Sequence, residues 1–176
     1  MQDFQVGHRY PNWCLDESPA GMYVATGSKN LTARLWSLEK EFPLITYAGH
    51  TQDVECVAFH LNGTYIATGS LRLWCVTSGK LMPVFADCKQ PICSLAFSPH
   101  GKMLAAGGEE SKIRIIDLAA GFQVNELKDH SLSIASIAWN TNGRYLASAC
   151  RDGTLRVWDV KKKLLPMRFL FLPFCI

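Results

Sequence analysis

One phrase recurs four times along this chain of 176 residues, and such a repeat constrains the fold more strongly than any single motif. The copies begin at Gly7, Gly49, Asp87 and Asp129, so that successive copies start roughly 40 residues apart. An arginine followed two positions later by tryptophan or isoleucine closes each copy, and it recurs at the same regular interval. We therefore divide the chain into four repeats, at about 7–48, 49–86, 87–128 and 129–170.

Each repeat has the pattern of short β-strands. Apolar runs flank turns that contain Asn62-Gly63, His100-Gly101 and Asn142-Gly143, which is the sequence pattern of a β-hairpin. Later turns, such as the one through Arg151-Asp152-Gly153, bring the expected number of strands in each repeat to four. Because no apolar period of the helical kind persists, we predict no helix, and the predicted fold class is all-β.

The composition excludes several classes of protein. Hydrophobic residues make up 48% and charged residues 19% of the chain, which is typical of a globular protein. A net charge of +3 gives no support for a nucleic-acid or membrane-surface partner. The apolar run at residues 164–176 is interrupted by two prolines and an arginine and is too short to span a bilayer.

Seven cysteines without a CxxC pair indicate reduced thiols, and hence an intracellular rather than a secreted protein. A zinc site built from Cys88 and Cys93 with His50 or His130 is the alternative interpretation of two of them. Its spacing matches no common ligand pattern, so we predict no metal and no cofactor.

The last repeat contains His130, Ser148 and Asp152, three residue types that act as base, nucleophile and orienting acid in acyl transfer. The same spacing recurs in the first repeat and, in part, in the second. An enzyme needs one triad, whereas a repeat protein needs one brace in each repeat, so we predict structural sets and no catalytic residue. The sets are His130, Ser148, Asp152 and Trp158; His8, Thr26, Asn30 and Trp36; and His50, Thr68 and Trp74.

Four-stranded repeats of this length, with a Gly-His start and a Trp-Asp end, resemble the WD40-repeat family over residues 7–163. The resemblance implies a partial WD40 β-propeller over residues 1–163, with about four blades in an incomplete or open arc. Residues 164–176 then supply the outer strand of the last blade and an apolar tail. In this family the recurring polar residues form a hydrogen-bonded tetrad, which supports the structural interpretation of the sets.

The four copies differ in how complete the tetrad is. Only the last copy is complete, because the first has Asn30 in place of the acid and the third, with Glu110 nearby, is expected to rest on packing alone. The second lacks the acid because four residues are missing between Ser70 and Leu71. We predict a two-residue turn at Gly69-Ser70 that places Thr68 opposite Leu71, in a blade less stable than the last one.

A narrower resemblance lies in residues 33–70 and in the "RYPNW" of residues 9–13. These phrases are similar to the C-terminal propeller of the TFIID subunit 5 family and its SAGA-complex paralogues. The resemblance implies a nuclear, non-enzymatic subunit of a general transcription or coactivator complex, which packs against histone-fold subunits. That family's propeller has seven blades, so we expect a fragment of a larger product or a truncated isoform, with "MQDFQV" as the outer strand of a preceding blade. A piece that closes only with a partner is the alternative.

The loops that enter the inner strands are the expected rim for binding partners, although solvated loop residues are the alternative interpretation. Two alternative functions stay open from the sequence. One is a WD40 adaptor of another complex, such as the substrate-recognition subunit of a ubiquitin ligase, and the other is a hydrolase that uses the triad. The rim residues are Arg9, Tyr10, Gln52, Asp53, Lys89, Gln90 and Ser131.

Overall fold

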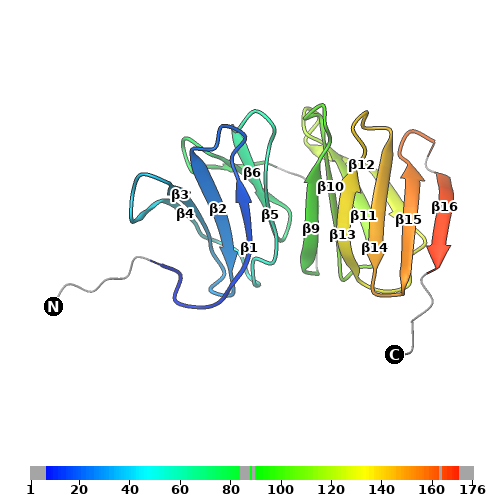
Figure 1. Cartoon of the computed structure of the whole chain (residues 1–176), viewed down its shortest axis with the longest axis horizontal. Coiled ribbons are helices and arrows are strands. Elements are labelled where there is room, and N and C mark those ends of the chain that lie inside the picture. The colour runs from blue at the N-terminus through cyan, green and yellow to red at the C-terminus, as the bar shows by residue number, and fades with distance from the viewer. Residues whose placement is uncertain (1–6, 84–87, 89, 163, 171–176) are drawn as a thin grey trace. The chain divides into compact units, whose positions relative to one another are not determined.

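The computed structural model describes residues 7–83, 88, 90–162 and 164–170, and the regular structure of these residues is β-strand throughout (Figure 1). Sixteen strands are described, and they form four antiparallel sheets of four strands each. No helix in this part of the chain is long and apolar enough to cross a membrane. The predicted all-β class and the four four-stranded blades are thus confirmed.

The chain divides into two compact units, of which the first, Met1–Pro83, holds two blades. Each blade is a simple meander, because its strands pair in the order in which they follow one another. The first blade contains β1 (Asn12–Glu17), β2 (Tyr23–Ser28), β3 (Ala33–Ser37) and β4 (Pro43–Tyr47). The second contains β5 (Val57–Phe59), β6 (Tyr65–Thr68), β7 (Arg72–Cys75) and β8 (Leu81–Met82).

The second unit, Val84–Ile176, holds the other two blades. The third blade contains β9 (Ile92–Phe97), β10 (Met103–Gly108), β11 (Lys112–Asp117) and β12 (Phe122–Lys128). The fourth contains β13 (Ile134–Trp139), β14 (Tyr145–Cys150), β15 (Thr154–Asp159) and β16 (Leu164–Leu170). β16 occupies the segment in which the outer strand of the last repeat was expected, whereas residues 1–6 and 171–176 lie outside the described residues.

Within each unit the two blades pack face to face through a hydrophobic core. In the first unit, Ala25 and Leu35 of the first blade share a core with Ile66 and Trp74 of the second. In the second unit, Ile113 and Ile115 of the third blade share one with Leu146 and Trp158 of the fourth. The blades approach so closely that a Cβ atom added at Gly107 would lie 2.7 Å from Ile137 Cδ1, so a larger residue there would force the Ile137 side chain to shift. Every blade therefore depends on its neighbour for burial.

The predicted pairing of the shortened hairpin is wrong. Thr68 lies opposite Arg72, not Leu71, which is the register of Thr26 with Arg34 and of Ser148 with Arg156. The four-residue loss falls entirely in the turn, where Ser70 and Leu71 adopt left-handed φ values of 65° and 53°. Such values are costly for residues other than glycine. The blade accepts this strain because the register that it keeps places the indole of Trp74 on the hydroxyl of Thr68.

We predict that the strained hairpin of the second blade opens more readily than the intact hairpin of the fourth. Amide hydrogen exchange reports local opening directly. Exchange should be faster in residues 64–74 than at the equivalent positions of residues 144–158. Equal or greater protection in residues 64–74 would contradict the prediction.

Candidate functional site

The tetrad of the fourth blade forms a continuous chain of hydrogen bonds. His130 Nδ1 lies 3.1 Å from Asp152 Oδ2, and His130 Nε2 lies 2.7 Å from Ser148 Oγ. Since a carboxylate only accepts, Nδ1 carries the proton and Nε2 accepts from the Ser148 hydroxyl. The chain ends at Trp158, whose Nε1–H donates to Ser148 Oγ over 2.9 Å. It joins the loop before β13 to strands β14 and β15.

Asp152 is the electrostatic centre of this tetrad. Its carboxylate also accepts hydrogen bonds from the backbone N–H of Ser131 and from the hydroxyl and N–H of Thr154. Burial acts to raise the pKa of Asp152, but these hydrogen bonds and the one from His130 outweigh it and hold the pKa well below its ordinary value. Arg156, only 2% exposed, lies 3.8 Å from this carboxylate and 2.6 Å from Asp129.

The first blade repeats this geometry with an amide in place of the acid. His8 Nδ1 lies 3.2 Å from Asn30 Oδ1, and His8 Nε2 lies 2.8 Å from Thr26 Oγ1. Trp36 Nε1–H donates to the same hydroxyl over 2.8 Å, and Thr32 donates to Asn30 Oδ1. The set is partly exposed, whereas the tetrads of the second and fourth blades are buried.

The second blade contains the chain of hydrogen bonds without its acid. Thr68 Oγ1 lies 2.9 Å from His50 Nε2 and accepts the indole N–H of Trp74 over 2.8 Å. His50 Nδ1 is buried and has no hydrogen-bond partner among the described residues. Burial, with a smaller contribution from the Arg72 guanidinium, lowers the pKa of His50 to about 4. This histidine is therefore neutral over the physiological pH range.

The third blade corrects the expectation that it rests on packing alone. Ala106 and Ile116 are buried apolar residues, as the loss of the tetrad requires. Glu110, however, forms an ion pair with Arg114 and lies 3.1 Å from Lys112 Nζ. Lys112 Nζ also lies 2.9 Å from Glu126 on the outer strand β12. A partly exposed ionic network thus joins the hairpin to β12, where the other blades have the tetrad.

The catalytic interpretation of the triad fails because a substrate cannot reach the Ser148 hydroxyl. Ser148 is 1% exposed, and its hydroxyl lies between His130 and the indole of Trp158. A substrate carbonyl has no path to this oxygen, although nucleophilic attack requires close approach. The geometry is that of a brace between loop and strands.

Metal-ligating side chains gather at one place in the described part of the chain. The ligand atoms of His130, Cys150 and Asp152 all lie within 4.8 Å of one another. Each is already hydrogen-bonded, Cys150 Sγ to the carbonyl of Leu132, and the nearby Arg156 cation opposes a second positive charge. Cys88 and Cys93 do not belong to this group.

The expected rim residues occupy the loops before the inner strands. Arg9 and Tyr10 precede β1 and are exposed, and Asp53, before β5, accepts a hydrogen bond of 3.1 Å from Trp13 Nε1. In the second unit, Gln90 and Ser131 are exposed before β9 and β13, Gln52 in the first unit is partly exposed, and Lys89 lies outside the described residues. Trp13, 52% exposed, joins the first unit's rim, although the sequence analysis did not include it.

The other residues that sequence analysis missed are those that support the tetrads. Arg156 pairs with Asp129, and its counterpart Arg34 donates to the carbonyl of Gly7 over 2.8 Å. Both arginines tie β-strands to the entry loop of their own blade. The sequence does mark these arginines, because an arginine stands two residues before each closing tryptophan.

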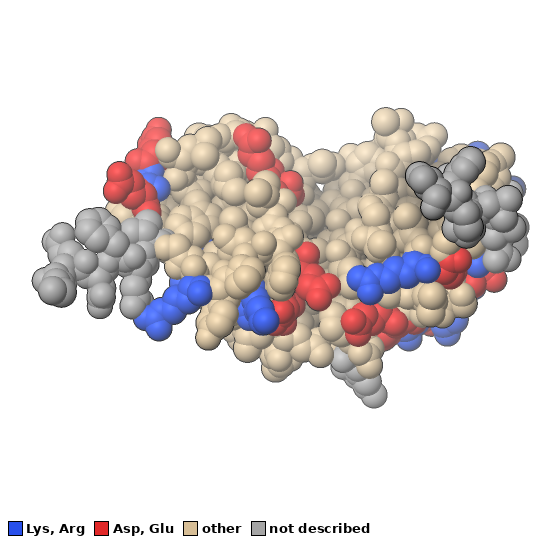
Figure 2. All heavy atoms as spheres, turned by 60° about the horizontal axis from the view of Figure 1, so that its bottom comes forward, with Lys and Arg blue, Asp and Glu red and all other residues tan. Residues whose placement is uncertain are grey.

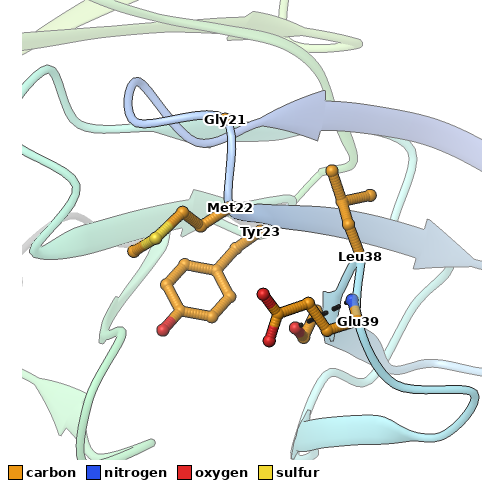
Figure 3. Close-up of a pocket in the computed structure, with 6 residues that line it drawn as sticks. Gly21, Met22, Tyr23, Leu38 and Glu39 are labelled. Atoms are coloured by element: carbon orange, nitrogen blue, oxygen red, sulfur yellow. Dashed lines mark hydrogen bonds between the residues drawn. The ribbon is translucent and has the colours of Figure 1, made fainter.

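A pocket of about 270 Å³ lies at the opposite end of the first blade from the tetrad loops (Figure 3). It is lined by the turn before β2 and the loop after β3. Met22, Tyr23 and Leu38 form its apolar wall, and Glu39 is the charged residue that lines it. On the face shown in Figure 2, acidic and basic side chains are interspersed, with no continuous field of one sign.

Meandering four-stranded blades, three of which carry a complete or partial tetrad, define a WD40-type β-propeller array. The family model described as "WD domain, G-beta repeat" matches residues 4–37, 41–75, 79–117 and 121–159. The chain belongs to this family, whose members are scaffolds for protein interaction, and the predicted family is confirmed.

The chain is similar to curated proteins whose names refer to transcription initiation, pre-mRNA processing and the small ribosomal subunit. It is 29% identical to Transcription initiation factor TFIID subunit 5 of Caenorhabditis elegans, over 84% of this chain and 24% of that protein. It is 28% identical to Pre-mRNA-processing factor 19 of Oryza sativa subsp. japonica, over 89% of this chain and 31% of that protein. Small ribosomal subunit protein RACK1y of the same organism is 30% identical, over 90% of this chain and 51% of that protein. The chain thus spans about a quarter to a half of the relatives' lengths.

Replacing Asp152 tests the brace of the fourth blade. Asp152→Ala should lower the free energy of unfolding by about 2 kcal/mol or more, because it removes the carboxylate that accepts from the buried donors of His130 and Thr154. Asp152→Asn should cost less, since Asn30 fills the same place in the first blade. Urea denaturation of both variants measures the difference. Equal losses would show that the acceptor at this position does not matter.

Restoring the missing turn tests the second blade. Inserting Arg-Asp-Gly-Thr between Ser70 and Leu71 copies the turn of the fourth blade and supplies an acceptor to His50 Nδ1. The insertion should stabilise the chain by about 1 kcal/mol or more and raise the pKa of His50, as measured by denaturation and by NMR titration. The matched control, Arg-Ala-Gly-Thr, has the same length without the carboxylate. Identical behaviour of the two insertions would contradict the account.

Acid should destabilise the fold before its carboxylates are protonated. His8, His50 and His130 all have lowered pKa values, chiefly through burial. A lowered histidine pKa stabilises the fold above the unfolded value of about 6.5, and this stability is lost as pH falls toward the folded pKa. For His50 the loss between pH 7 and pH 5 is about 2 kcal/mol. Calorimetric melting temperatures should fall across this window, whereas a constant value would contradict the prediction.

Proposed function

We propose that the chain is a non-catalytic interaction scaffold of a nuclear transcription or coactivator complex of the TFIID or SAGA type. The observation that carries this proposal is the similarity to TFIID subunit 5, which extends over 84% of the chain. Its partners would be other protein subunits, those with histone folds among them. The proposal includes no cofactor, small-molecule substrate, membrane or direct nucleic-acid contact.

The rim of the first unit is the surface proposed to contact these partners. Tyr10 is 59% exposed and Trp13 is 52% exposed, and Arg9 lies beside them in the sequence. Aromatic residues and arginine are the residue types that contribute most to protein–protein affinity. The hydrogen bond from Trp13 to Asp53 fixes the indole before a partner arrives, which reduces the entropy that binding costs.

A second candidate is an adaptor of a different complex. Two relatives at similar identity favour it, because they are named for other roles: Pre-mRNA-processing factor 19, and RACK1y, a small ribosomal subunit protein. A substrate-recognition subunit that reads an acidic peptide would need a deep pocket with basic residues. The pocket in Figure 3 has no basic lining residue, and its charged residue is the acid Glu39.

Quantitative affinity purification of the full chain from nuclear extract separates the two functions. Recovery of TFIID or SAGA subunits supports the first proposal, and recovery of splicing or ribosomal proteins in their place contradicts it. Trp13→Ala should reduce recovery at least tenfold if the rim is the contact surface. Leu61→Ala, at a 49% exposed residue in the turn between β5 and β6, is the matched control and should leave recovery unchanged.

A further inference from the structure

His50 carries a buried hydrogen-bond donor that the second blade leaves without an acceptor. The side chain is 5% exposed, and its Nε2 lies 2.9 Å from Thr68 Oγ1. Because this hydroxyl accepts the indole N–H of Trp74, its own proton is donated to Nε2, and Nδ1 carries the N–H. Nδ1 has no partner among the described residues. A ligand that accepts from this buried N–H would remove the cost of leaving it unpaired.

The ring of His50 is placed as the other tetrad histidines are. Its centroid lies 6.0 Å from that of Trp74, and the equivalent distances in the first and fourth blades are 6.1 Å and 5.9 Å. Nδ1–H is therefore aimed at the place where Asn30 and Asp152 accept the same hydrogen bond in those blades. The second blade supplies no such residue, because its turn is four residues shorter.

Arg72 is the second group that has lost its acids. Its counterpart in the fourth blade, Arg156, lies 2.6 Å from Asp129 and 3.8 Å from Asp152. Gly49 stands where the fourth blade has Asp129, and the counterpart of Asp152 is missing. The guanidinium still lies over the entry loop, since a Cβ atom added at Gly49 would be 3.3 Å from Arg72 Nη1. The second blade has thus lost both acids and kept the cation and the histidine that contact them.

The two groups lie close together at the edge of the blade. Burial lowers the pKa of His50 most, and the charge of the nearby Arg72 lowers it further. Arg72 and Ser70 are partly exposed, and the two residues that flank His50 in the chain, Gly49 and Thr51, are exposed. The left-handed turn that closes the site is strained, which lowers the cost of the movement that admits a ligand to Nδ1.

We propose that the second blade binds one carboxylate of a partner protein, which accepts from His50 Nδ1–H and pairs with the Arg72 guanidinium. Arginine and carboxylate form strong, charge-assisted hydrogen bonds. A carboxylate fits better than a phosphate, because the site has one cation and the fourth blade holds a carboxylate at the equivalent place. The site takes a single acidic side chain and is not a deep basic pocket. It does not depend on which complex the chain serves.

NMR of the full chain, observed at the ring of His50 and at constant ionic strength, tests the site. Acetate supplies the carboxylate alone, and the end-blocked peptide Asp-Gly-Thr copies residues 152–154. Both should shift the ring signals saturably. The peptide should bind more tightly, because its threonine orients the carboxylate as Thr154 orients Asp152. The end-blocked peptide Ala-Gly-Thr is the matched control and should cause no saturable shift.

Two variants locate the contact. Arg72→Gln should weaken binding of the Asp-Gly-Thr peptide by about tenfold or more, because it removes charge-assisted hydrogen bonds. Insertion of Arg-Asp-Gly-Thr between Ser70 and Leu71 should abolish binding, because the chain's own carboxylate then accepts from His50. Arg144→Gln, at a 48% exposed side chain of the fourth blade, is the control variant and should bind as the unaltered chain does.

The proposal would be overturned if acetate and the Asp-Gly-Thr peptide left the His50 ring signals unchanged, or if Arg72→Gln bound as tightly as the unaltered chain. Tighter binding of inorganic phosphate than of acetate would overturn the assignment to a carboxylate. Acetate binding as tight as that of the peptide would overturn the assignment to a protein side chain. The indole N–H signal of Trp74, which is bonded to Thr68, shows whether each variant keeps the blade folded.

Discussion

The structure depends on one hydrogen-bond chain, which runs from a loop histidine through a serine or threonine hydroxyl to a tryptophan indole. In the fourth blade it starts at a carboxylate, and Trp158 lies at its end in the core between two blades. A buried indole N–H and a buried hydroxyl are costly unless both are paired. The chain pairs them and, in the same step, fixes the loop that precedes the inner strand. The same hydrogen-bond chain therefore sets both the packing of the tryptophan and the position of the loop before the inner strand.

The copies show which part of this chain is indispensable. The second blade has lost the acid, yet Thr68 still connects His50 and Trp74, and the strand register is held at the cost of two left-handed residues. The third blade has lost all the tetrad residues and has an ionic network around Glu110 instead. The hydroxyl–indole pair is kept wherever the tryptophan is kept. The acid varies independently of this pair, because the second blade lacks it and the first has Asn30 in its place.

The sequence predicted much of this fold because each blade is built from local signals. Gly turns between apolar runs specify hairpins, and the regular interval between the repeated phrases specifies where one blade ends. The pairing of Thr68 with Arg72 differs from the predicted two-residue turn, because the observed register keeps the indole of Trp74 on the hydroxyl of Thr68, a contact that turn type alone does not reveal. The ion pair of Arg156 with Asp129 and the hydrogen bond of Trp13 with Asp53 join residues far apart in the chain. The repeat marks Arg156 as a recurring residue, but a single sequence holds no local signal for the partner that either residue contacts.

Hydrogen exchange of the tryptophan indole N–H groups tests the central claim most directly, because the chain has five tryptophans in different settings. The account predicts slow exchange for Trp74 and Trp158, faster exchange for the partly exposed Trp36, and the fastest exchange for Trp13 on the rim. NMR resolves each indole separately, and Trp139, which donates to a backbone carbonyl, serves as an internal reference. Exchange of Trp158 as fast as that of Trp13 would contradict the claim that the tetrad holds the blade together.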